Sequence, residues 1–199
     1  MNLSRTLSIL LISFWFAASL IGGALGIFNE PGKPPVMLAG FIVVPIAGFI
    51  VAYFISSSFR SFSQSIDLKL LVVLHLWRFV GLGFIIGWLA GVLPAGFSLL
   101  EGLGDTVAAA GALVLFTVLR KGKAPKGWLL AWNIFGLIDL ISAITVGILY
   151  SNSSIGILNK GTVNTSFMVS FPVNIIPTFF VPFFILLHLL TFKKIRELK

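Results

Sequence analysis

Two kinds of residue are scarce in this 199-residue sequence: it contains no cysteine, and only 10% of its residues are charged. Without cysteine, disulfides, thiolate metal sites, cysteine nucleophiles and thiol redox relays are excluded. A soluble domain has roughly a quarter of its residues charged, so a water-soluble enzyme of ordinary design is excluded too. The Gly-x-Ser-x-Gly, His-Glu-x-x-His and P-loop motifs are also missing. No catalytic residue is identified, and enzymatic activity is not the favoured interpretation.

Apolar residues are abundant instead, at 58% of the sequence with a mean hydropathy of +1.08. They come in blocks of about 17 to 25 residues, the length a helix needs to cross a bilayer core. This pattern predicts an all-α, polytopic integral membrane protein, with residues 1–199 forming a single transmembrane domain of six helices. The predicted spans are 7–27, 36–56, 70–93, 97–119, 128–150 and 171–192.

The basic residues indicate how such a bundle is oriented. With the N-terminus inside, eleven of the 14 Lys and Arg residues lie on the inner side, Lys33 and Lys160 lie outside, and Arg78 falls within a span. The positive-inside rule therefore predicts that both termini are cytoplasmic, and we expect a cytoplasmic-type, bacterial inner membrane. The inner basic residues are Arg5, Arg60, Lys69, Arg120, Lys121, Lys123, Lys126, Lys193, Lys194, Arg196 and Lys199.

The net charge of +8 is therefore read as a signal of topology rather than of nucleic-acid binding. The basic loop at 120–126 and the tail at 193–199 are expected to attract anionic lipid headgroups. No nucleic-acid partner is expected.

Six polar or charged side chains within the spans need an explanation, because a charge near the bilayer centre costs several kcal/mol and usually faces the bundle interior. Counting 1.5 Å per residue from the inner ends places them in an inner and a central layer. In the central layer Arg78 is predicted to lie between Asp139 and Asp105. Gly102 and Gly104 could end the helix before Asp105, which makes it the weakest member. The six residues are His75, Arg78, Asp105, Asn133, Asp139 and His188.

Spacing supports this grouping. His75 and Arg78 are three residues apart and share a helix face, and Asn133, Gly136 and Asp139 are stacked in the same way. We expect these two faces to oppose each other. One interpretation is a buried ion-pair network that fixes helix register. The other is a site for proton coupling or anion handling, because two carboxylates share one guanidinium.

The two histidines allow a further interpretation, because His75 and His188 lie at similar depth on different spans. Bis-His ligation of haem b needs this arrangement, although no spacing motif supports it. A metal ion shared with Asp or Asn, and a hydrogen-bonded structural or proton-relay role, are the alternatives.

The sixth span contains repeated prolines. Pro177 and Pro182 each lack a backbone donor, so the outer half of this helix is predicted to be kinked or broken. Interrupted helices often line transport sites, and Asn174 and Thr178 add polar groups to this face. An ordinary Pro-kinked helix is the competing interpretation.

Two rows of small residues, at steps of four, are predicted helix contact faces for a homo-oligomer or a partner subunit. They are Ala18, Gly22 and Gly26, and Gly83, Gly87 and Gly91.

The favoured function is a small transporter or proton-linked permease, with a pathway formed by the six buried groups together with Asn174 and Thr178. A bis-His haem electron carrier and a non-catalytic subunit of a larger membrane complex remain the alternatives.

Overall fold

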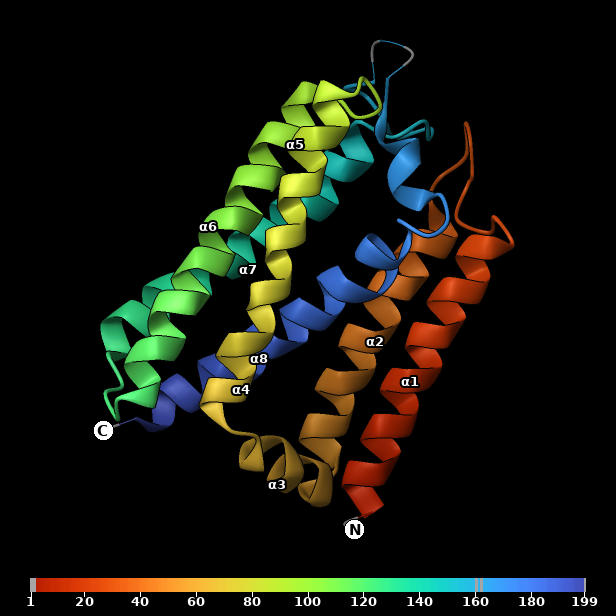
Figure 1. The fold of residues 1–199 in the computed structure, drawn as a ribbon. Helices are drawn as coiled ribbons and strands as arrows, with labels where there is room; N and C mark the ends of the chain where they lie inside the picture. Colours follow the sequence, from red (N-terminus) through yellow and green to blue (C-terminus); the bar gives the residue numbers. More distant parts are fainter. Residues whose placement is uncertain (1–2, 160, 162, 199) are drawn as a thin grey trace. The chain divides into compact units, whose positions relative to one another are not determined.

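The computed structural model describes residues 3–159, 161 and 163–198, which form helices joined by turns and loops, without any β-strand (Figure 1). Six helical segments among them are long and apolar enough to cross a membrane, which confirms the predicted number of spans. They are Arg5–Ala24, Val36–Ile55, Leu68–Leu89, Ala95–Arg120, Lys126–Leu149 and Ile176–Glu197.

The chain divides into two compact units. The first comprises the described residues of 1–65 and 148–186, and the second those of 66–147 and 187–199. Because helix α8 (Val181–Glu197) crosses this boundary, it contributes its first residues to the first unit and the rest to the second.

The first unit contains α1 (Leu3–Ala24), α2 (Val36–Ile55), the short α3 (Ser57–Ser65), the 3₁₀ helix η2 (Thr165–Val169) and the π-helix η3 (Ile176–Phe180). The η3 segment packs against both α1 and α2. Only 6% of the most apolar window of α2 is buried. Such an exposed helix, apolar on all sides, is typical of a segment that crosses a membrane.

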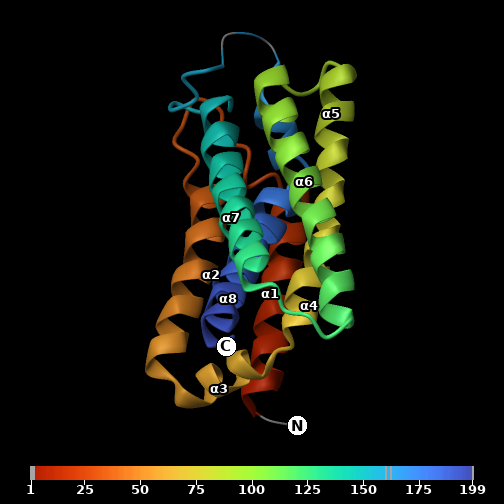
Figure 2. The same ribbon diagram turned by 90° about the vertical axis from the view of Figure 1, so that its left-hand side faces the viewer.

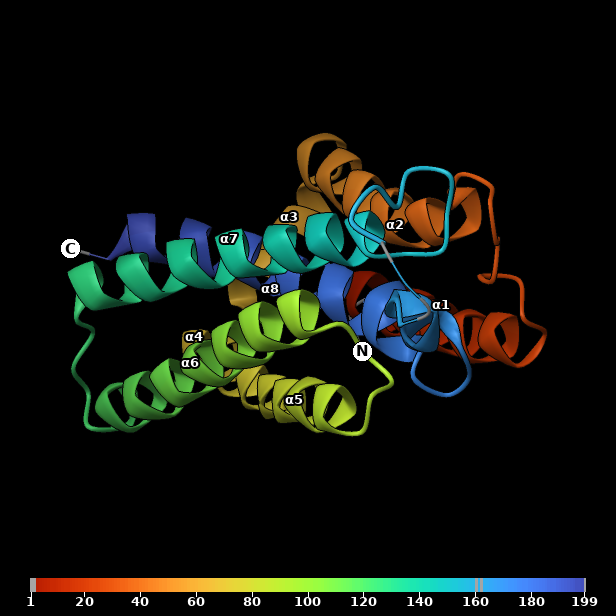
Figure 3. The same ribbon diagram turned by 90° about the horizontal axis from the view of Figure 1, so that it is seen from above.

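The second unit begins with three consecutive segments that form one membrane-length rod: α4 (Leu68–Val73), the 3₁₀ helix η1 (Leu74–Gly81) and α5 (Leu82–Leu89). Helix α6 (Ala95–Arg120) runs beside this rod, as the view from above shows (Figure 3). Helix α7 (Lys126–Leu149) follows α6 through the basic loop (Figure 2). The rod is reversed into α6 at Gly91, whose φ of +72° is a conformation that favours glycine.

The sixth span is displaced along the sequence from its predicted bounds. The prediction places it at 171–192, whereas the helical segment runs from Ile176 to Glu197. Residues 171–174 form turns, and the π-helix follows, so the predicted interruption is present at Pro177. The C-terminal end extends further than hydropathy indicates because Lys194 and Arg196 are favourable in the last turn of a helix.

An apolar cluster closes one end of the second unit. Its members are fully or almost fully buried and come from α4, α6, α7 and the C-terminal part of α8. They are Val72, Ala112, Leu115, Leu119, Leu129, Trp132 and Ile195. The indole of Trp132, a member of this cluster, also donates a hydrogen bond of 2.8 Å to the Ala108 carbonyl, which joins α7 to α6.

Candidate functional site

Arg78 is the centre of the polar site in the second unit, and its position follows from the local helix type. In a 3₁₀ helix the side chains at i and i+3 lie directly above one another. His75, Arg78 and Gly81 are therefore in one row along η1, and they are the buried residues of this segment. The side chain of Arg78 is only 1% exposed.

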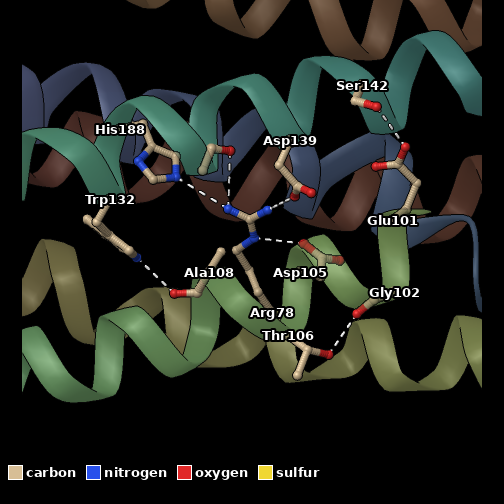
Figure 4. A network of polar contacts seen from close by, with 11 residues as sticks. Arg78, Glu101, Gly102, Asp105, Thr106, Ala108, Trp132, Asp139, Ser142 and His188 are labelled. Atoms are coloured by element: carbon tan, nitrogen blue, oxygen red, sulfur yellow. Dashed lines mark hydrogen bonds and ion pairs between the residues drawn. The ribbon is translucent and has the colours of Figure 1, made fainter. Parts of the chain in front are cut away.

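The Arg78 guanidinium is surrounded by acceptors from three other helices (Figure 4). Its Nε donates to Asp105 Oδ1 on α6 at 2.7 Å, and Nη2 forms an ion pair with Asp139 Oδ2 on α7. Its Nη1 donates to the Gly136 carbonyl at 3.2 Å and lies 3.4 Å from His188 Nε2 on α8. Charge-assisted bonds of this kind are the strong class of hydrogen bond, so Arg78 joins α6, α7 and α8 to the rod.

The protonation of His188 follows from its two neighbours. Its Nδ1 lies 2.9 Å from Asn133 Oδ1, which can only accept, so Nδ1 carries the ring proton. The other nitrogen, Nε2, faces the Arg78 donor and is the acceptor in that contact. His188 is thus a neutral imidazole that connects Asn133 to the guanidinium.

His75 lies against His188 rather than at a distance from it. The two ring centroids are 4.1 Å apart, and the Trp132 ring contacts both histidines at 5.0 and 5.1 Å. A bis-His haem needs its macrocycle between the two imidazoles. Rings in direct contact leave no space for it, and both nitrogens of His188 are already engaged. The histidines in this arrangement do not fit the haem interpretation.

A metal centre has no better support. Within the described residues, no group of three or more His, Asp and Glu side chains is arranged to hold a metal ion. What the site offers chemically is ion pairing, hydrogen bonding and proton exchange.

Glycines on the facing helices allow the close approach that this site requires. A Cβ at Gly136 would lie 2.5 Å from His188 Nε2 and 3.0 Å from Arg78 Nη1. A Cβ at Gly104 would overlap the Asp139 carboxylate. Gly102 and Gly104 do not end the helix as considered from sequence, because α6 is continuous through both and Asp105 reaches Arg78.

This polar region has one member that is not among the residues predicted from the sequence, Glu101. Its side chain is 1% exposed, and its Oε1 accepts a hydrogen bond of 2.9 Å from the Ser142 hydroxyl. The available signal was its spacing. Glu101 lies four residues before Asp105, and Ser142 lies three after Asp139, so both occupy faces that already carried a site residue.

Asn174 and Thr178 form a separate polar cluster inside the first unit. Asn174 Nδ2 donates to the Ser19 carbonyl at 2.7 Å, and Thr178 Oγ1 donates to the Asn174 carbonyl at 2.7 Å. The Thr178 carbonyl, which loses its helical partner at Pro182, accepts from Trp15 Nε1 at 2.9 Å and is 3.4 Å from Ser19 Oγ. Side chains of α1 thus satisfy the interrupted helix.

The lipid and partner contacts expected from sequence stay predictions. Lys160 and Lys199 lie outside the described residues. In the glycine rows, Gly26 and Gly91 have positive φ and follow the last residues of α1 and α5, whereas Gly83 has open space around its Cα.

Comparison with known proteins identifies a family but no characterised relative. No curated protein and no solved structure matches the chain. Residues 35–196, which include every member of the Arg78 site, match a family described as "Domain of unknown function (DUF8737)". Because the match covers most of the sequence, the chain belongs to this family, whose function is not assigned.

Proposed function

We propose that this protein is a small proton-linked membrane permease whose coupling centre is Arg78 with Asp105 and Asp139. The observation that carries the proposal is the fully buried guanidinium shared by two carboxylates within membrane-length apolar helices. Charged groups in such helices are costly and usually belong to proton or substrate pathways.

The two carboxylates are more exposed than the Arg78 side chain. The side chains of Asp105 and Asp139 are 14% and 9% exposed, against 1% for Arg78. The carboxylates are therefore less enclosed than the guanidinium, as exchange of a proton at these groups would require.

The coupling that we propose is a competition for one carboxylate. When Asp139 binds a proton, it becomes neutral and its attraction to Arg78 weakens. The Nη2 donor of Arg78 is then available to another acceptor, such as an anionic group of a transported solute. Deprotonation of Asp139 restores the ion pair and displaces that group. The neutral His188 keeps the guanidinium in place through Nη1.

The test is proton flux in liposomes that contain the purified protein, with an imposed pH gradient. Asp139→Asn keeps the shape and one acceptor oxygen but cannot cycle a proton, so flux should fall by about 100-fold. Asp139→Glu should retain part of it. Thr145→Ala is the matched control on the same helix, because Thr145 is exposed and bonds only to the Ile141 carbonyl of its own turn.

The Asp139→Asn protein must elute and melt as a folded protein. If it then shows the same proton flux as the wild type, the Arg78 centre has no part in the mechanism. Proteoliposomes without any proton flux or solute exchange would contradict the permease itself. In the orientation that we propose, both termini face the cytoplasm and the Ala95 end of α6 faces outward.

A further inference from the structure

Glu101 is a buried carboxyl group that the Arg78 centre does not use. Its Oε1 accepts the Ser142 hydrogen bond, whereas its Oε2 has no hydrogen-bond partner among the described residues. A buried ionised carboxylate is costly unless it is paired. The Arg78 N–H groups are directed at Asp105, Asp139, Gly136 and His188 instead.

Helix geometry places Glu101 and Ser142 beyond the Arg78 centre. From Asp105 to Glu101 the rise along α6 is about 6 Å, and from Asp139 to Ser142 along α7 it is about 4.5 Å. Both steps lead toward the same end of the two helices, at Ala95 and Leu149. The Glu101–Ser142 pair therefore lies one turn closer to that end than the two aspartates (Figure 4).

A second orphaned polar atom lies still closer to this end. Ser98 is 0% exposed, and its hydroxyl has no hydrogen-bond partner among the described residues. It is three residues before Glu101 on α6, so it shares the same helix face. Two unsatisfied buried groups on successive turns indicate a site that is completed by something outside the protein.

We infer that Glu101 and Ser142 form a second proton-binding site, which receives protons from the Ala95 end of α6 and passes them to the Arg78 centre. This inference rests on the proposed permease function. The charged groups that face Glu101 are Asp139 from α7, Asp105 from its own helix and Arg78 from η1. Of these three groups, only the two aspartates can accept a proton.

The proton is transferred in two steps, first to Glu101 and then to Asp139. A proton from water bonds to Glu101 Oε2 and gives a neutral carboxylic acid, while the Ser142 hydroxyl holds Oε1. The O–H bond then breaks, and the proton bonds to a carboxylate oxygen of Asp139, directly or through water. Glu101 returns to the carboxylate, and no electron or other group moves. The Ser98 hydroxyl lies on the approach, where it can both donate and accept.

The experiment compares Glu101→Gln with Thr145→Ala in liposomes under an imposed pH gradient. We expect Glu101→Gln to lower proton flux by about 100-fold and Thr145→Ala to leave it unchanged. Glu101→Asp keeps the carboxyl group and should restore part of the flux. Ser142→Ala leaves the carboxyl group in place and should lower flux less than Glu101→Gln does.

A second readout does not depend on transport. Infrared spectra of the wild type at neutral pH should contain the carbonyl-stretch band of a protonated carboxyl group, which shifts in D₂O and is absent in Glu101→Gln. A Glu101 that stays ionised would give no such band, and that result would contradict the inference. If Glu101→Gln has normal proton flux while the separate Asp139→Asn variant has none, the inference is overturned and the permease proposal stands. A flux that follows a sodium gradient and ignores the pH gradient also overturns it.

Discussion

At the scale of single residues, the site depends on how closely the backbone of one helix approaches the side chains of its neighbours. Gly136 is the clearest case, because its carbonyl accepts from Arg78 and its missing side chain makes room for the His188 ring. A methyl group at this position would displace the imidazole from the guanidinium. Protein interiors are packed so densely that such a displacement lowers stability.

Gly136→Ala is therefore expected to lower the free energy of unfolding by about 1–3 kcal/mol and to reduce proton flux together with it. Thermal unfolding in detergent and the liposome assay measure the two effects. Gly127→Ala, on the same helix, is the matched control, because a Cβ at Gly127 meets nothing within 4 Å. The control should be neutral or more stable by about 0.5–1 kcal/mol. Equal behaviour of the two variants would argue against close packing at Gly136.

At the scale of elements, the interrupted sixth span shows how a helix with prolines is kept intact in an apolar environment. Pro182 lies in the first turn of α8, directly after the π-helix, and supplies no donor to the Thr178 carbonyl. The indole of Trp15 supplies it instead. The prolines predict the interruption from sequence, but the donor lies more than 160 residues away along the chain.

This replacement predicts an interaction between two substitutions. Trp15→Phe removes the indole hydrogen bond to the buried Thr178 carbonyl and leaves the longer contact of 3.4 Å with the Ser19 hydroxyl. This loss should lower the free energy of unfolding by about 1–3 kcal/mol. In the Trp15→Phe/Pro182→Ala double variant, the N–H of residue 182 can serve the carbonyl, so the loss should be smaller. A double-mutant cycle of thermal unfolding measures this coupling, expected at about 1 kcal/mol.

Trp128→Phe is the control for this cycle, because Trp128 is 66% exposed and should change stability by less than about 0.5 kcal/mol. Strictly additive effects of Trp15→Phe and Pro182→Ala would show that the indole is not the substitute donor.

At the scale of the whole molecule, the sparse charges divide into two groups by their position. Most basic residues lie in loops and at helix ends, where the positive-inside rule uses them to predict the orientation of the chain. Arg78, Asp105, Asp139 and Glu101 are instead within membrane-length helices of the second unit. The orientation itself is a testable property, because a chain without cysteine accepts single reporter cysteines.

Lys33→Cys and Lys121→Cys are suitable reporters, since both positions are exposed and lie on connections between spans. In intact cells, a membrane-impermeant maleimide should label Lys33→Cys, and Lys121→Cys should react only after permeabilisation. The basic residues predict this result through the positive-inside rule. Labelling in the reverse order would invert the proposed direction of proton uptake at Glu101.

Much of the site could be predicted because helix periodicity is local. The stacking of His75 with Arg78, and of Asn133 with Asp139, needs only a step of three residues. Glu101 escaped prediction because it lies near the start of its span, where a charged residue is unremarkable. Whether its carboxyl faces water or Ser142 depends on α7, which is distant in sequence.

By itself, the sequence determined that the chain is helical, that it has six membrane-length segments, and where the helix-breaking prolines lie. It also located three of the four charged groups of the buried polar region, Arg78, Asp105 and Asp139. These follow from composition and local spacing, which act through the backbone and the hydrophobic effect. The tertiary structure alone decided which groups meet: the neutral His188 between Asn133 and Arg78, the His75 ring against the His188 ring, and Glu101 with Ser142. Such pairings depend on how helices distant in sequence approach each other, and glycine positions such as Gly136 set that approach.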